Sequence, residues 1–411
     1  MRFTRVALVL ICLLLNLPLA AAAASSAAPD VGVTQHADVV IPARPITSQA
    51  QLDAYVHDTP SSRSPLNWLT PPARKRFLSG LVFHDSGLSG LYLGDVSYEL
   101  TGEQAYALLR LFGAQSYALS LDARNTSRPR DASAEASTLE TGYTELVATA
   151  DQPNHAQAIA QAYAQRFSAM QTGAQRRALS GRDAELLFRA AALVFRVTQR
   201  PSYVNDMRAD FSELQRRDLV DRPYASDLFD ALIVSGNTTG ARALRATYPL
   251  IERGSVATMR TAGRVRPGKP SLWIVNTERG ERELVRYPFN IHARAQIIVL
   301  ASTSCHFSER AARAIEADPA LSEVFRENAQ WVAPASDLTA FDAINVWNQT
   351  HTSSRLGVIH DDAELPMVKR IETPTFYFLD HGRVVDTVVG WPAGGNIEAL
   401  RRGLRTIELQ R

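Results

Sequence analysis

One stretch of the sequence joins an apolar run, a cysteine and a helical pattern in direct succession. Residues 295–301 are mostly apolar and include several β-branched side chains, as in a buried strand. Small polar residues follow, then Cys305, and then an amphipathic pattern to about residue 316. A cysteine at such a turn lies near the unpaired N–H groups that open a helix, and these groups stabilise a thiolate. The stretch therefore predicts a strand, a turn with a reactive cysteine, and a helix.

The start of the chain has the pattern of an export signal. A basic beginning is followed by an apolar segment at 6–19 and by small residues at 20–24. This pattern is typical of a bacterial signal peptide. We therefore expect residues 1–24 to be removed and the protein to be periplasmic or secreted.

The sequence contains two cysteines, Cys12 and Cys305. Cys12 lies in the apolar part of the leader, and Ile11 before it is not a small residue, so we do not expect a lipoprotein site. Removal of the leader would leave Cys305 as the single cysteine of the mature protein. Exported proteins usually carry cysteines in pairs. Cys305 would therefore stay free, form an intermolecular disulfide, or be inert.

Composition excludes several classes of function. The chain has 411 residues, of which 45% are hydrophobic, which indicates a globular protein of more than one domain. Without the two arginines of the leader, 42 basic residues face 42 acidic ones. This balance gives no electrostatic case for binding nucleic acid or an anionic membrane. No apolar run after the leader is long enough to predict a membrane span.

The remaining sequence divides into segments of different pattern. Residues 25–46 are rich in Ala, Ser and Pro and are expected to be a disordered lead-in. Residues 47–253 carry helical patterns, residues 254–270 are rich in Gly, Arg and Pro as in a linker, and residues 271–411 alternate strand and helix patterns. The predicted fold class is α plus α/β, with an N-terminal α-helical bundle and a C-terminal α/β domain.

Helix-start signals recur through the helical segment. The predicted N-caps are Ser48, Thr70, Thr101, Asn154 and Asp183. Short connections between amphipathic helices imply antiparallel packing. The Gly- and Ser-rich segment 84–95 and the polar segment 124–137 are interpreted as connecting loops.

The C-terminal segment has a definite order of predicted elements. They are a hairpin (271–288), the strand and helix around Cys305, a strand (330–334), a helix (338–349), two strands joined by a tight turn at Asp380–Gly382, and a helix (396–409). Thr373-Pro374 opens the first of the two late strands, where a proline is awkward because it lacks a backbone donor. Gly390 is expected to form a bulge in the second.

This order resembles the thioredoxin superfamily, in particular the exported bacterial thioredoxin-like proteins, over residues 271–411. Cys305 matches the position of the family's nucleophilic cysteine. Thr373-Pro374 matches its threonine and cis-proline, which present backbone to a bound extended peptide. The resemblance implies a thioredoxin-like domain whose client-binding residues would include Thr373, Pro374, Phe307 and Trp391.

The sequence departs from the family at the second cysteine. The family's oxidoreductases carry C-x-x-C, whereas this chain has C-H-F-S, similar to the C-G-F-S of monothiol glutaredoxins, with Ser308 in the last position. Without a resolving thiol, a disulfide cycle cannot close within the chain. One-thiol chemistry remains possible, such as attack on a mixed disulfide, capture of a client thiol or oxidation to a sulfenate. Ser308 and a protonated His306 could then stabilise the thiolate.

Two functions of different class follow. In the first, an exported thiol-redox protein acts through Cys305 on thiols or mixed disulfides of client proteins, and the helical domain positions the client or mediates self-association. In the second, a degenerate thioredoxin-like domain is a non-catalytic scaffold that binds its partners through the helices. A one-cysteine peroxidase is less favoured because no proline precedes Thr303 nearby. No cofactor is expected.

One further group of residues could in principle hold a metal ion. His360, Asp361, Asp362 and Glu364 lie in one short segment. No second cluster accompanies them, so we interpret the segment as a solvated turn and predict no metal site.

Overall fold

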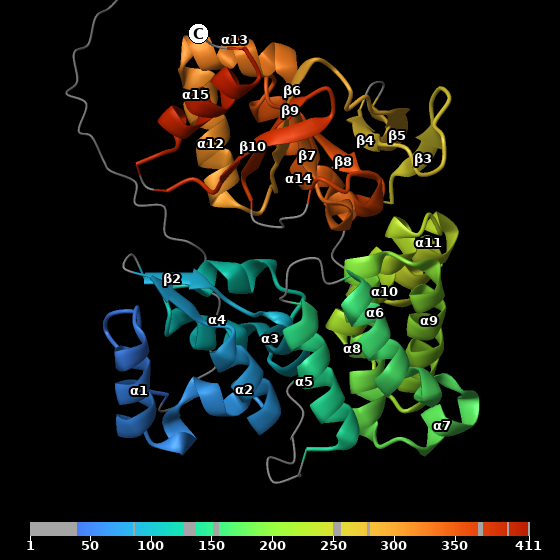
Figure 1. Cartoon of the computed structure of the whole chain (residues 1–411). Helices are drawn as coiled ribbons and strands as arrows, with labels where there is room; N and C mark the ends of the chain where they lie inside the picture. The colour runs from blue at the N-terminus through green and yellow to red at the C-terminus, as the bar shows by residue number, and fades with distance from the viewer. Residues whose placement is uncertain are drawn as a thin grey trace, which may run out of the picture. The chain divides into compact units, whose positions relative to one another are not determined.

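A mixed sheet forms the centre of the C-terminal part of the protein (Figure 1). The computed structural model describes residues 39–84, 87–126, 136–150, 156–249, 256–277, 280–368, 373–392 and 394–409. The predicted signal peptide and most of the predicted lead-in lie outside these residues. The described strands of the sheet are β3 (Thr258–Thr261), β4 (Ser271–Asn276), β5 (Glu283–Pro288), β6 (Ala295–Leu300), β7 (Ala329–Ala333), β8 (Leu356–Ile359), β9 (Thr375–Asp380) and β10 (Arg383–Val389).

The strand order is that of a thioredoxin-like domain with additional strands on one side. In space the strands follow the order β10-β9-β6-β7-β8-β4-β5-β3. β6 pairs parallel with β7 and antiparallel with β9, which pairs antiparallel with β10. The predicted hairpin is confirmed as β4 and β5. β8, which the sequence did not lead us to expect, joins this hairpin to the central strands.

The two faces of the sheet are covered differently, because successive side chains of a strand point to opposite faces. Ile297 and Val299 face the core that contains the helices, whereas Ile298 and Leu300 face a second core closed by connecting segments. The helices of this region are α12 (His306–Ala317), α13 (Pro319–Asn328), α14 (Phe341–Thr350) and α15 (Ile397–Thr406). Burial on both faces explains why β6 is a continuous apolar run.

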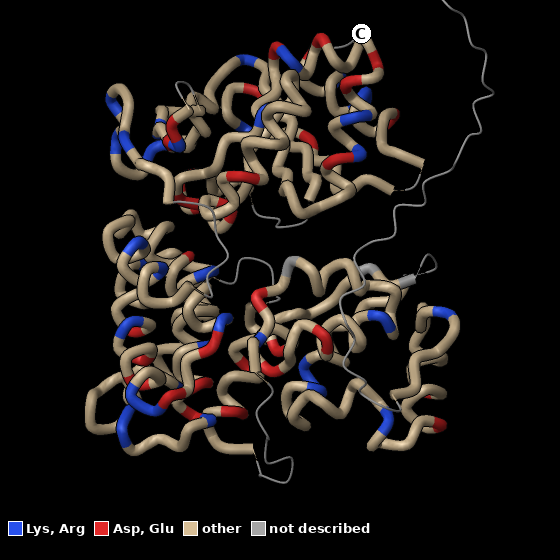
Figure 2. The backbone as a smooth tube through the Cα atoms, turned by 180° about the vertical axis from the view of Figure 1, so that it is seen from behind, with Lys and Arg blue, Asp and Glu red and all other residues tan. Residues whose placement is uncertain are grey.

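The N-terminal part is helical, as predicted. Its helices are α1 (Gln49–Asp58), α2 (Pro71–Ser79), α3 (Gly94–Glu99), α4 (Gly102–Arg110), α5 (Thr138–Ala150), α6 (Ala156–Arg166), α7 (Gly173–Ala178), α8 (Gly181–Thr198), α9 (Pro201–Arg216), α10 (Arg222–Val234) and α11 (Thr238–Thr247). α8 is buried over most of its length and packs against α5, α6, α9 and α10. Basic and acidic residues are mixed along these helices (Figure 2). No helix of the described residues is long and apolar enough to cross a membrane.

Some of the predicted N-caps are confirmed, and one is wrong. The Ser48 side chain caps α1, and Thr101 forms a full capping box with Gln104 at the start of α4, so both N-caps are confirmed. Asp183 is not an N-cap. Ser180 is the cap of α8, accepting from the Asp183 N–H, and the Asp183 carboxylate accepts from the Ser180 hydroxyl. The serine and the acid therefore exchange hydrogen bonds across the first turn, and the N-cap lies three residues before the predicted one. Asn154 lies outside the described residues.

Two connecting segments contain more structure than expected, and one predicted bulge is absent. The predicted loop at 84–95 includes β2 (Gly87–Gly90), which pairs with β1 (Val82–His84), and the start of α3. The predicted linker at 254–270 includes β3, which pairs parallel with β5. Gly390 is not a bulge: it follows β10 with a positive φ of 77°, and the register of β9 and β10 shifts instead between Val384 and Asp386.

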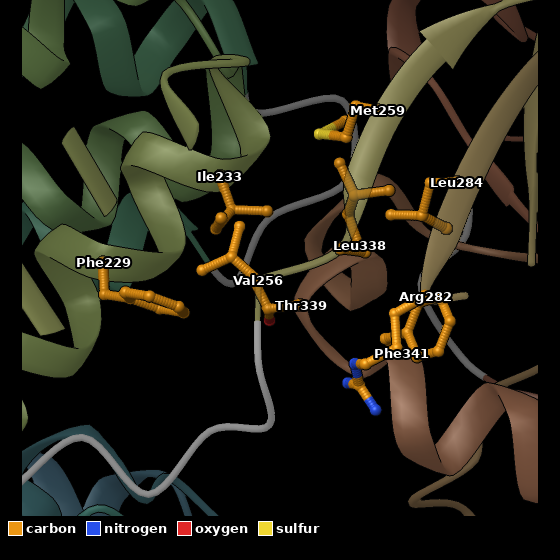
Figure 3. Close-up of a pocket in the computed structure, with 10 residues that line it drawn as sticks. Phe229, Ile233, Val256, Met259, Arg282, Leu284, Leu338, Thr339 and Phe341 are labelled. Carbon is orange, nitrogen blue, oxygen red and sulfur yellow. The ribbon is translucent and has the colours of Figure 1, made fainter. Parts of the chain in front are cut away.

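An apolar junction connects the helices with the sheet (Figure 3). Phe229 and Ile233 of α10 face Leu338 and Leu284 across the segment that contains Val256. These contacts belong to one hydrophobic core that runs from the helices into the sheet, and Val40–Arg411 form one compact unit. The junction therefore fixes the end of α10 beside the segment that follows β7.

Candidate functional site at Cys305

Cys305 lies in the turn between β6 and α12, as predicted from the sequence. Its backbone forms the N-cap of α12, because the Cys305 carbonyl accepts from the N–H groups of Ser308 (3.0 Å) and Glu309 (3.3 Å). Its side chain makes no capping hydrogen bond. The thiol is partly exposed, and its hydrogen-bond partner lies outside α12.

The thiol is directed at the segment that precedes β9. Cys305 Sγ donates to the carbonyl oxygen of Thr373 at 3.1 Å, and the peptide bond from Thr373 to Pro374 is cis. Gly390 in turn donates its N–H to the Pro374 carbonyl at 2.7 Å, which anchors this segment to the end of β10. A carbonyl accepts a hydrogen bond from a thiol but not from a thiolate. The contact therefore holds the protonated cysteine against the Thr373-Pro374 backbone.

The other predicted site residues surround this contact at different depths. Ser308 is fully buried, and its hydroxyl accepts from the Ser302 N–H at 3.4 Å rather than from the thiol. His306 and Phe307 are exposed, and their rings lie 3.9 Å apart between centroids. Trp391 is buried, with its ring 6.2 Å from that of Phe376. The structure thus brings Cys305, Thr373 and Pro374 into contact and places Trp391 in the core.

A polar chain beside the cysteine was not predicted. The Ser302 hydroxyl, which follows β6, donates to Asp337 Oδ2 at 2.9 Å and lies 3.1 Å from the Ser304 hydroxyl. Asp337 belongs to the 3₁₀ turn Ala335–Thr339 after β7. Burial raises its pKa, although hydrogen bonds from Ser302 and Ser336 act in the opposite direction. Ser302 and Asp337 meet because each follows one of two adjacent parallel strands, β6 and β7, whose ends lie at the same edge of the sheet.

The segment with several possible metal ligands contains a turn, Asp362–Glu364, that is only partly solvated. Glu364 is buried, accepting from the Ser271 hydroxyl at 2.7 Å and pairing with Arg286 at 3.0 Å. His360 Nδ1 accepts from the Trp273 indole N–H at 3.1 Å. Glu364 and His360 thus tie the segment to β4 and β5, whereas Asp361 accepts from the Ala363 N–H and Asp362 from the Ala335 N–H. Among the described residues, no group of three or more His, Cys, Asp or Glu side chains is arranged to hold a metal ion.

Comparisons with known proteins show no family for this chain. No family model matches the chain, and no curated protein matches it. Among solved structures, the chain is similar to a thioredoxin-like protein from Bacteroides caccae, with 11% sequence identity and a TM-score of 0.21. The match covers 70% of this chain and 99% of that chain. The thioredoxin-like fold class is carried by the strand order β10-β9-β6-β7, with the cysteine turn between β6 and α12.

Proposed function

We propose that this protein is an exported bacterial thiol-redox protein that exchanges disulfides with client proteins through Cys305. The observation that supports the proposal most directly is the contact between the Cys305 thiol and the Thr373 carbonyl, next to Pro374. Cys305 is also the N-cap of α12, and it lies beside backbone that would pair with an extended client.

The reaction proceeds by thiol–disulfide exchange. Cys305 loses its proton to solvent, since the Thr373 carbonyl cannot accept one, and the S–H···O contact breaks. The thiolate then attacks one sulfur of a client mixed disulfide, so that a bond between Cys305 and the client forms, the old S–S bond breaks, and the other thiol leaves as thiolate. A thiol from a second molecule must release the client, because Ser308 replaces a resolving cysteine.

Each neighbouring residue has a proposed role. Thr373 would offer its backbone to the client main chain once the contact with the thiol is broken, and Pro374, whose carbonyl accepts from the Gly390 N–H, would hold Thr373 in place. The exposed rings of His306 and Phe307 would contact the client beside the reacting sulfur. The Ser308 hydroxyl accepts a hydrogen bond from the Ser302 N–H and therefore fixes the turn between β6 and α12. In this role it positions the cysteine rather than activating it.

Alkylation compares the folded cysteine with the same cysteine in the unfolded chain. We expect iodoacetamide at neutral pH to modify Cys305 faster in the native protein than in urea, because the helix start favours the thiolate. A Cys305→Ser variant identifies any reaction at Cys12 in material that retains the leader. Slower alkylation in the native protein would contradict the thiol-redox proposal.

A second candidate is a non-catalytic scaffold with the same fold. The hydrogen bond from the thiol to the Thr373 carbonyl favours this alternative, because it stabilises the protonated cysteine. A scaffold would bind its partner equally well as wild type and as Cys305→Ala. Loss of a covalent client adduct in that variant, with non-covalent binding kept, distinguishes the redox protein from the scaffold.

A further inference from the structure

A cavity of about 180 Å³ lies among α8, α9 and α10, and the turn after β7 contributes to its wall. It is lined by Ala192, Phe195, Arg196, Gln199, Met207, Asp227, Asp230, Ala231, Val234 and Ser336. All but the last come from the helical part of the chain. A concave site with mostly apolar walls and a few polar groups at its edge is the usual form of a ligand pocket.

The walls suit an apolar side chain. Phe195, Met207 and Val234 supply apolar surface, and methionine adapts its shape to different occupants. Two of the charged groups that line the cavity pair with each other: Arg196 Nη2 lies 3.4 Å from Asp227 Oδ2, and Asp227 also accepts from the Tyr98 hydroxyl. A charged occupant would therefore have to compete with an existing ion pair.

The cavity is connected with the cysteine turn through hydrogen-bonded side chains. Ser336 at the cavity wall lies 3.5 Å from Asp337 Oδ1, whose other oxygen accepts from Ser302. The Ser302 hydroxyl contacts Ser304, and the Ser302 carbonyl accepts from the Cys305 N–H at 3.1 Å. A short series of hydrogen-bonded residues thus connects the cavity wall with Cys305.

A second link fixes the helical side of the cavity. Gln199, the C-cap of α8, donates to Asp362 Oδ2 at 3.4 Å, and Asp362 Oδ1 accepts from the Ala335 N–H at 3.3 Å. α10 packs directly against the turn Ala335–Thr339. The helices and the turn after β7 are therefore held together on both sides of Ser336.

We infer that this cavity is a subsite for an apolar side chain of the client polypeptide, a few residues from the cysteine that reacts with Cys305. The inference rests on the proposed function and adds to it a substrate class: extended polypeptides with an apolar residue near the reacting cysteine. The helical part of the chain would then contact the client directly and take part in its selection.

Synthetic peptides provide the test. Each carries one cysteine as a mixed disulfide with thionitrobenzoate, and Leu, Asp or Lys occupies successive positions on either side of that cysteine. Attack by Cys305 releases the coloured thiol once per protein molecule and gives a second-order rate constant for each peptide. We expect Leu at one position to raise this rate constant about tenfold over Asp or Lys, a typical discrimination by an apolar pocket. Equal values at every position would overturn the inference.

Cavity variants show where the preference arises. Ala192→Met fills the cavity and should abolish the preference for Leu, whereas Met207→Ala enlarges it and should shift the preference toward Phe. Ala178→Met places the same new side chain on the exposed end of α7 and should change nothing. If Ala192→Met unfolds the protein, Met207→Ala still decides the question. Unchanged preferences in that variant would contradict the inference.

A small aromatic disulfide without a peptide tests the thiol chemistry of Cys305 separately from the apolar subsite. Wild type and all three variants should react with it at the same rate, since it needs Cys305 but not the cavity. If the small disulfide reacts and the peptides show no preference, the subsite is wrong and the thiol chemistry stands. If Cys305 fails to react with the small disulfide as well, the proposed function is wrong and the subsite falls with it.

Discussion

At the scale of single residues, the contact between Trp273 and His360 makes stability depend on pH. The indole N–H donates to His360 Nδ1, which can accept only while the imidazole is neutral. Burial lowers the pKa of His360, and the charge of Arg286 acts in the same direction. A histidine with a lowered folded-state pKa binds protons more readily when the chain is unfolded. Its contribution is therefore complete above the unfolded value of about 6.5 and is lost as the pH falls below it.

We expect the free energy of unfolding to decrease by about 1 kcal/mol between pH 7 and pH 5 through this contact, the usual value of one hydrogen bond. Urea unfolding of wild type and of His360→Phe at both pH values measures it. The variant should lose less stability on acidification than wild type, because it has no proton to gain. An equal loss in the two proteins would show that other groups cause the pH dependence.

Single residues also show where sequence reasoning ends. Cys305 and Pro374 could be identified because a lone cysteine at a helix start and a proline at a strand start are unusual in themselves. Asp337 could not, because its importance depends on its position beside Ser302, which is set by the pairing of β6 with β7. An acidic residue in a polar segment looks the same in a sequence whether it is buried or solvated.

At the scale of elements, Gly403 allows α15 to approach the sheet closely. A Cβ at this position would overlap the Phe378 ring, which is fully buried in β9 and has no space to move. We expect Gly403→Ala to destabilise the protein by about 1–3 kcal/mol through overpacking, despite a gain in helix propensity of up to about 1 kcal/mol.

Urea unfolding provides the measurement, with Gly102→Ala as the matched control. Gly102 opens α4, and a Cβ there would meet no atom within 4 Å. The control should be neutral or slightly stabilising. Equal stability of the two variants would mean that α15 shifts to accommodate the extra methyl group.

The elements themselves were predictable to different degrees. β6, β9 and α15 have strong periodic patterns and were predicted with nearly correct bounds. β3 was missed because it is short and exposed at the edge of the sheet, so that pairing with β5 and not burial makes it a strand. α13 was missed although Asp318 and Pro319 form a helix-start signal, an N-cap followed by a proline at the first helical position.

At the scale of the whole molecule, buried charges tie distant helices together. Arg76 of α2 makes two hydrogen bonds to Asp95 of α3, at 2.8 and 2.9 Å, and pairs with Glu140 of α5 at 2.7 Å. Arg189 of α8 is fully buried, pairs with the same Asp95, and lies over the Tyr143 ring. The sequence did not predict this network, because its members are far apart in the chain and each alone looks like a surface charge.

Asp95 pairs with both guanidinium groups, so its charge is expected to stabilise the arrangement of these helices. Asp95→Asn keeps the size of the side chain but turns an amide N–H₂ group toward two buried cations. We expect it to lower the free energy of unfolding by about 3–5 kcal/mol, as when one partner of a buried ion pair is removed. Asp342→Asn is the control: Asp342 pairs with Arg282 but is 58% exposed, and its loss should change stability by less than about 1 kcal/mol. A similar small effect for both variants in urea unfolding would mean that water or a rearranged acid compensates Arg76 and Arg189, and that packing rather than charge holds these helices in place.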